Sequence, residues 1–124
     1  MNNPIPQKTK YVEKAWGYEL WIHNTKAYCG KLLVFKKDAK SSMHYHIEKE
    51  ETWYVAQGEF KYKWIDTNTA QEHKQRLKRG DVIHLLPGQP HQLKALTKDA
   101  TIFEVSTEHF EHDSYRVKPG DSQK

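Results

Sequence analysis

Short segments with a strong preference for β-structure recur along this sequence and constrain its fold more than any other feature. They are rich in aromatic and β-branched residues and cover residues 11–12, 18–22, 31–35, 52–55, 60–65, 82–86, 91–96 and 101–105. Turn-forming pairs such as Gln57-Gly58, Gly80-Asp81 and Pro87-Gly88 separate them. Because no window has a helical apolar period, we expect an all-β sandwich or barrel with at most one helical turn, at His109–Ser114.

The length of 124 residues leaves room for one domain with a single core. We expect this domain to span residues 11–117, with residues 1–10 as a loose N-terminal arm and residues 118–124 as a flexible tail. A small all-β domain has exposed sheet edges, and covering them across a two-fold axis predicts a homodimer to which residues 11–21 contribute.

Charge and cysteine content exclude several classes of partner. The net charge is +4, but the basic residues are interspersed with 16 acidic ones, so we expect no nucleic-acid partner. A mildly basic surface nevertheless suits an anionic small substrate such as a phosphosugar. No apolar run reaches the roughly 18 residues of a membrane span, and the N-terminus has no signal-peptide pattern, so we expect no membrane partner. The single cysteine, Cys29, excludes an internal disulfide and predicts a reducing, cytoplasmic location.

The segment around His44 predicts a metal site. Residues two apart in a strand point to the same face, so His44 and His46 direct their imidazoles toward one point. A carboxylate from the next strand would add an oxygen ligand, a set that suits iron, manganese or zinc. His91 follows a Pro-Gly turn and begins a returning strand, which can bring a further imidazole to the same site.

The carboxylate has three candidates, Glu48, Glu50 and Glu51. We favour Glu51 because it shares a strand face with Trp53, and we keep Glu50, on the opposite face, as a second choice. A lone His-X-His is common and means little, but its combination with the glutamate, Gly58 and the turn before His91 is much harder to obtain by chance. The role of His84 is open, and His23, His73, His109 and His112 are expected at the surface.

The spacing of His44, His46, Glu51 and Gly58 resembles the first motif of the cupin family, and residues 80–91 approximate the second motif. The resemblance implies a double-stranded β-helix, the jelly-roll or cupin barrel. It also implies one divalent transition metal (Zn, Mn, Fe or Ni), held by His44, His46, Glu51 and His91.

A closer likeness covers residues 16–116 and is to the type II mannose-6-phosphate isomerase cupins. It is carried by residues 16–19, 51–55 and 103–106, followed by Asp113 and Arg116. Four residues separate His46 from Glu51, more than is usual in that family. The resemblance implies aldose–ketose isomerisation of a sugar phosphate.

Such a reaction needs a Lewis acid at the carbonyl, a base that moves a proton between two carbons, and a cation for the phosphate. Glu51 and Glu104 are the candidate bases. Arg116, at the position of the family's arginine, is the first candidate for the phosphate and Lys94 the second. Trp53 and Tyr62 are candidates for lining a sugar pocket, although aromatic residues on strands are more often core.

Two other functions are compatible with the same residues. Three histidines and a glutamate would also serve a small non-haem iron dioxygenase, because such a site keeps open positions for oxygen. A cupin can also bind a sugar or a metal without catalysis, since the fold alone does not decide function.

Overall fold

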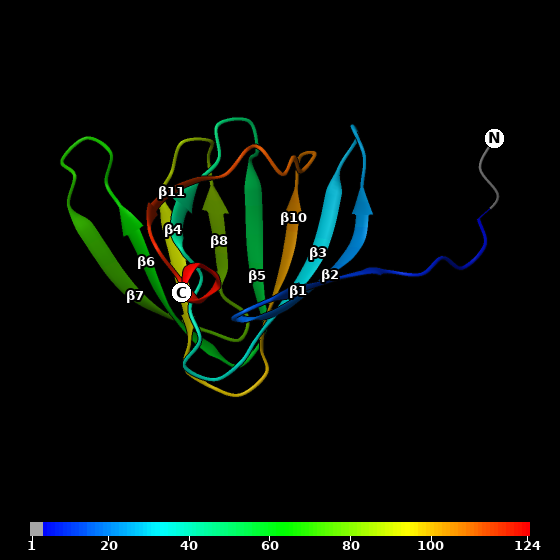
Figure 1. Ribbon diagram of the computed structural model, residues 1–124, viewed down its shortest axis with the longest axis horizontal. Coiled ribbons are helices and arrows are strands. Elements are labelled where there is room, and N and C mark those ends of the chain that lie inside the picture. The colour runs from blue at the N-terminus through cyan, green and yellow to red at the C-terminus, as the bar shows by residue number, and fades with distance from the viewer. Residues whose placement is uncertain (1–3) are drawn as a thin grey trace.

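The computed structural model describes residues 4–124 and consists of two antiparallel β-sheets that face each other (Figure 1). In spatial order, the six-stranded sheet contains β1 (Lys10–Lys14), β2 (Gly17–Asn24), β3 (Cys29–Phe35), β10 (Ala100–Ser106), β5 (Glu51–Gln57) and β8 (Val82–Leu85). The five-stranded sheet contains β11 (Tyr115–Lys118), β4 (Met43–Tyr45), β9 (His91–Ala95), β6 (Glu59–Ile65) and β7 (Glu72–Lys78). The expected jelly-roll is therefore confirmed.

Alternation along the strands places the core between the sheets. Val55 on β5, Phe60 on β6 and Ile102 on β10 have no exposed surface and belong to one hydrophobic cluster. Each fully buried side chain of this size contributes about 1.5–3 kcal/mol relative to an exposed one. Gly58 joins β5 to β6 at φ +75°, where a Cβ atom would lie 2.3 Å from the Thr97 hydroxyl, so this turn requires glycine.

The strands that the sequence did not predict are those with little buried surface. In β7 only Leu77 is buried, and all four residues of β11 are exposed. The helical turn also lies elsewhere than expected: residues 109–114 form turns and coil, whereas Asp121–Gln123 form a single 3-10 turn.

The C-terminal residues, for which we expected a flexible tail, are held against the body. The backbone N–H of Lys40 donates to Asp121 Oδ2 over 2.9 Å, and that of Ala15 donates to the Ser122 hydroxyl over 3.2 Å. Of the expected N-terminal arm, residues 1–3 lie outside the described residues, and β1 begins at Lys10. Within residues 4–124 no helix has the length and apolar character that a membrane crossing requires.

Candidate metal centre

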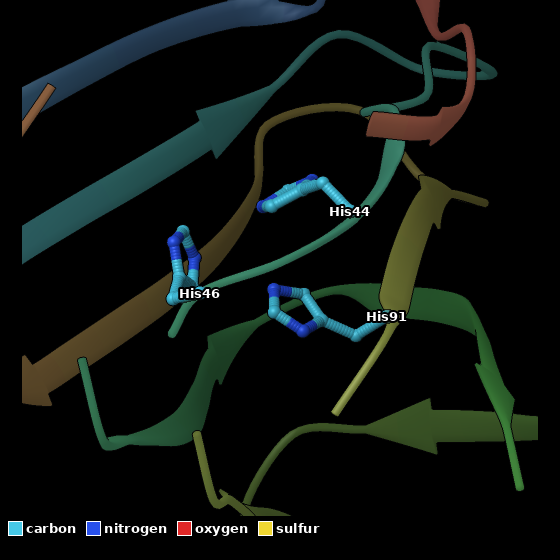
Figure 2. A group of neighbouring side chains, drawn as sticks. All are labelled: His44, His46 and His91. Carbon is cyan, nitrogen blue, oxygen red and sulfur yellow. The ribbon is translucent and has the colours of Figure 1, made fainter. Parts of the chain in front are cut away.

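Three histidines converge inside the barrel. His44 lies on β4, His46 follows that strand directly, and His91 begins β9, the neighbouring strand of the same sheet. His44 and His91 stand opposite each other in the strand register. Figure 2 shows the three rings directed toward one another, and one ligand nitrogen of each lies within 4.8 Å of the other two.

Each imidazole is oriented by a hydrogen bond to the main chain. The acceptors of the three Nδ1 atoms are the carbonyl oxygens of Ser42 (3.0 Å, for His44), Asp113 (2.5 Å, for His46) and Gln89 (2.9 Å, for His91). Since a carbonyl oxygen can only accept, each Nδ1 donates its proton to the main chain, which leaves Nε2 as the nitrogen that faces the centre. This is the tautomer and orientation that metal-binding histidines adopt in proteins.

The electrostatics of the cluster keep two of the rings neutral. Burial, together with the neighbouring histidines, lowers the pKa of His44 to about 3. Burial and the proximity of His46 likewise lower the pKa of His91 to about 3. Neutral imidazoles are the form that binds a metal, so near pH 7 no proton has to leave these two rings first.

Glu51 supplies the carboxylate closest to the histidines. Its Oε1 accepts a hydrogen bond from the Trp53 indole over 2.7 Å, while its Oε2 lies 3.2 Å from His46 Nε2 and 3.9 Å from His91 Nε2. Glu50, the second choice, points to the outer face, where its carboxylate lies 2.6 Å from the exposed His84. That contact also gives His84 a place at the surface, away from the histidine cluster.

The donor set fits a divalent transition metal. Glu51 Oε2 is the one fully buried side-chain nitrogen or oxygen in residues 4–124 that has no hydrogen-bond partner. An unpaired buried carboxylate oxygen is costly, and a cation bound between it and the three Nε2 atoms would remove that cost. A His44/His46/His91 cluster can therefore hold a divalent metal ion, with Glu51 on the opposite sheet placed to complete it.

A buried ion pair adjoins the centre. The Lys49 ammonium lies 3.2 Å from Glu104 Oε2 and 3.8 Å from Glu51 Oε2, and all three side chains are at most 5% exposed. Burial opposes the charge on Lys49, but the two carboxylates outweigh it and raise the pKa of Lys49. Burial alone would raise the pKa of Glu51, but Lys49 and His46 outweigh it and lower that pKa.

These groups line a cavity of about 200 Å³, smaller than the ~300–1,000 Å³ of sites for drug-sized ligands. Trp53, Glu104 and Arg116 contribute to its wall. Arg116 is exposed at the rim, next to His44 in the strand register. Tyr62 and Lys94 are outside this wall: Tyr62 packs in the core against Trp53, and Lys94 is on the outer face of β9, in register with Lys61.

The sequence did not indicate the roles of Asp113 and His109. The Asp113 carboxylate accepts the backbone N–H groups of residues 47–49 over 2.7–3.2 Å, while its carbonyl orients His46. His109, expected at the surface, is half-buried and lines the cavity. Asp113 was recognisable only through the resemblance, because its partners lie more than 60 residues away.

Comparison with solved structures gives the same fold. Oxalate decarboxylase from Bacillus subtilis, in which Mn(II) centres are known, is 18% identical with a TM-score of 0.75 over 88% of this chain and 30% of its own. KdgF from Halomonas sp. is 18% identical, with a TM-score of 0.71, and the match covers 83% of this chain and 89% of KdgF. The capsular polysaccharide assembling protein CapF from Staphylococcus aureus is 16% identical, with a TM-score of 0.75, and the match covers 91% of this chain and 33% of CapF.

The chain thus spans about a third of the length of oxalate decarboxylase and of CapF, and most of KdgF. No curated protein matches the sequence. The cupin domain family matches residues 31–108, which is more than half of the chain. With the jelly-roll fold and the converging histidines, this match shows that the chain belongs to the cupin family.

Proposed function

We propose that this cupin is a metal-dependent isomerase that interconverts the aldose and ketose forms of a sugar or sugar phosphate, as its resemblance to the type II mannose-6-phosphate isomerases implies. The observation that carries the proposal is the position of the Glu104 carboxylate and the Lys49 ammonium beside the histidine centre in one cavity. A carboxylate next to a Lewis-acid site is what proton transfer between neighbouring carbons requires.

When bound, a divalent metal would supply the Lewis acid that polarises the substrate oxygens at C1 and C2. Glu104 is then the candidate base for the proton that moves between these carbons, and the Lys49 ammonium pairs with it over 3.2 Å. Glu51 is placed to act as a ligand, with Oε1 held by Trp53. Arg116 forms no ion pair within residues 4–124, so its guanidinium is free to bind an anionic group at the rim.

The test is an isomerase assay under anaerobic conditions with Mn, Zn or Ni added. We expect turnover of a hexose 6-phosphate by the native protein, and a loss of about 10²–10⁴-fold in kcat for Glu104→Gln, the usual worth of a general base. Glu50→Gln is the matched control, because Glu50 pairs with His84 on the outer face.

Three results would contradict the proposal. Bound iron with oxygen consumption would indicate a dioxygenase. Sugar or metal binding without turnover would indicate a non-catalytic module. Equal kcat values for Glu104→Gln and the native protein would remove Glu104 from the chemistry.

We also propose that two copies associate through the outer face of the six-stranded sheet. One register row across all six strands consists of apolar side chains: Tyr11, Leu20, Leu32, Phe103, Tyr54 and Val82. Four of these are 37–60% exposed. The other sheet presents Lys61, Lys74 and Arg76 outward, so copies with a net charge of +4 would repel there and not at the apolar row. The lone buried Cys29 fits the reducing, cytoplasmic location that we propose.

A further inference from the structure

Lys31 is a second buried ammonium in the cavity, and its hydrogen-bonding capacity is not used by the protein. It lies on β3, faces inward, is 2% exposed and lines the cavity. Within residues 4–124 its Nζ donates no hydrogen bond, and its nearest carboxylate oxygen, Glu19 Oε1, is 3.7 Å away. An ammonium group carries three N–H donors. Lys31 Nζ is not among the fully buried atoms that lack a partner, so it borders the open space of the cavity. These donors are therefore available to a molecule in the cavity.

The position of this ammonium is fixed by its neighbours. Lys31 Nζ lies 4.2 Å from the centre of the Trp21 ring, and the Trp21 indole donates to Glu19 Oε1 over 2.8 Å. His109 packs edge-on against Trp21 at 5.1 Å and is itself held by Asn24 through two hydrogen bonds. Lys31 is thus held from one side, while the cavity borders the other.

Lys31 is not the counter-ion of Glu104. The two residues are opposite each other in the register of β3 and β10, yet the ion pair of Glu104 is formed with Lys49, at 3.2 Å. Lys49 in turn faces two carboxylates, whereas Lys31 has only the long contact to Glu19. Of the two buried lysines, Lys31 is therefore the one whose positive charge is available to an anionic ligand.

The strand register gives the backbone separation of Lys31 from Trp53, the residue beside the histidine centre. Lys31, Glu104 and Trp53 lie side by side on β3, β10 and β5. Neighbouring strands are about 4.8 Å apart, so Lys31 lies roughly 10 Å across the sheet from Trp53. Trp53 contacts both Glu51 and His91, which marks the metal end of the cavity. Glu104 stands between the two ends.

We infer that Lys31 binds the phosphate group of the substrate, and that the substrate spans the cavity with its reacting carbons at the histidine centre. This rests on the proposed isomerase function. A phosphate at the far end of a hexose chain lies several bonds from C1 and C2, which matches the separation of Lys31 from Trp53, with the carboxylate of Glu104 beside the chain. Arg116, the candidate from the sequence, is in register with His44 and so is close to the metal end. Lys14 also lines the cavity, forms no ion pair within residues 4–124 and adds positive charge to the cavity wall.

The first experiment compares Lys31→Met with the native holoenzyme on a hexose 6-phosphate and on the unphosphorylated hexose. We expect KM for the phosphosugar to rise at least tenfold, while the kinetic constants for the unphosphorylated sugar stay unchanged. Lys31→Arg, which keeps the charge, should recover part of the loss. Lys61→Met removes a partly exposed lysine from the outer sheet face and is the matched control.

The second experiment measures binding of inorganic phosphate to the metal-loaded protein by calorimetry and does not depend on turnover. Weaker phosphate binding by Lys31→Met, with Lys61→Met like the native protein, supports the site even if the isomerase assay fails. Isomerase activity with identical phosphosugar KM values for Lys31→Met and the native protein would overturn the inference and leave the proposed function intact. Equal phosphate affinity in Lys31→Met and the native protein would also overturn it. Thermal unfolding of Lys31→Arg checks that the fold is retained.

Discussion

Lys49 is the residue on which the charge balance of the interior depends. It faces Glu104 and Glu51, and these three side chains carry a net charge of −1 in a region with almost no solvent. Buried ion pairs contribute little net stability as a whole, but removing one partner leaves the other charges without compensation. Replacing Lys49 with a neutral residue should therefore lower the stability of the fold.

We predict that Lys49→Met lowers the free energy of unfolding of the metal-free protein by about 3–5 kcal/mol, because two buried carboxylates lose their cation. Urea unfolding at pH 7 measures this, with Lys61→Met on the outer face as the control. The lowered pKa of Glu51 means that its stabilising contribution is present above the ordinary glutamate pKa of about 4.3 and is lost as the pH falls below it. The difference between variant and native protein should therefore shrink in acid; the same difference at pH 3 as at pH 7 would contradict this account.

At the scale of elements, the loop between β4 and β5 determines the position of His46. Asp113, on the segment before β11, accepts three consecutive backbone N–H groups of this loop, and its own carbonyl accepts the Nδ1 proton of His46. Burial opposes the charge on Asp113, but these N–H groups outweigh it and lower its pKa. One residue thus connects the C-terminal segment to both the loop and His46.

We predict that Asp113→Asn weakens metal binding about 10–100-fold, the usual effect of losing a group that supports a ligand. The amide keeps one oxygen acceptor, but it lacks the charge and the second oxygen that the three N–H groups share. Competition with a fluorescent chelator measures the affinity. Asp81→Asn is a matched control, since Asp81 accepts the backbone N–H of Lys78 in a hairpin away from the centre. Equal metal affinities for the two variants would show that the loop holds its shape without Asp113.

The sequence predicted those parts of the fold and the site that depend on local pattern. Alternation placed His44 and Glu51 on inward faces, and the same rule separated Glu50 from the centre. The alternation rule did not predict that Lys31 is buried. A charged residue is buried only beside suitable partners, and Glu19 and Trp21 become partners of Lys31 only through the pairing of β2 with β3. β7 was not predicted because only Leu77 of this strand is buried, so its sequence has no apolar alternation.

At the scale of the whole molecule, the two outer faces differ in chemistry. The apolar row runs from β1 to β8 on one face, and lysines and an arginine occupy β6 and β7 on the other. A stable interface buries about 800 Å² on each partner, which a face of six strands can provide.

We predict that Phe103→Lys, at the centre of the row, converts a dimer into a monomer, because two buried ammonium groups would meet few counter-charges there. Sedimentation velocity at several protein concentrations measures the change. Lys61→Glu, on the opposite face, should leave the dimer intact. A native protein that sediments as a monomer at all concentrations would rule out this interface.

Metal binding should also stabilise the molecule as a whole. The histidines come from the five-stranded sheet and Glu51 from the six-stranded one, so a shared ion would fasten the two sheets together. We predict about one equivalent of transition metal per chain. We also predict a higher Tm with metal than after chelation, because metal at 1,000 times Kd raises the free energy of unfolding by roughly 4 kcal/mol. Elemental analysis and thermal unfolding test this, with the His46→Ala, His91→Ala double variant as the control. A native protein that takes up no metal after reconstitution would refute the ligand assignment.

The acceptors that orient the three imidazoles are main-chain oxygens, those of Ser42, Gln89 and Asp113. A substitution replaces a side chain but leaves the carbonyl in place, so most mutations at Gln89 keep the tautomer of His91 unchanged. Lys31, Glu104 and Arg116, in contrast, act through their side chains and can be exchanged one at a time. Descendants of this chain can therefore acquire new substrates by point mutation while inheriting an unaltered metal-binding geometry.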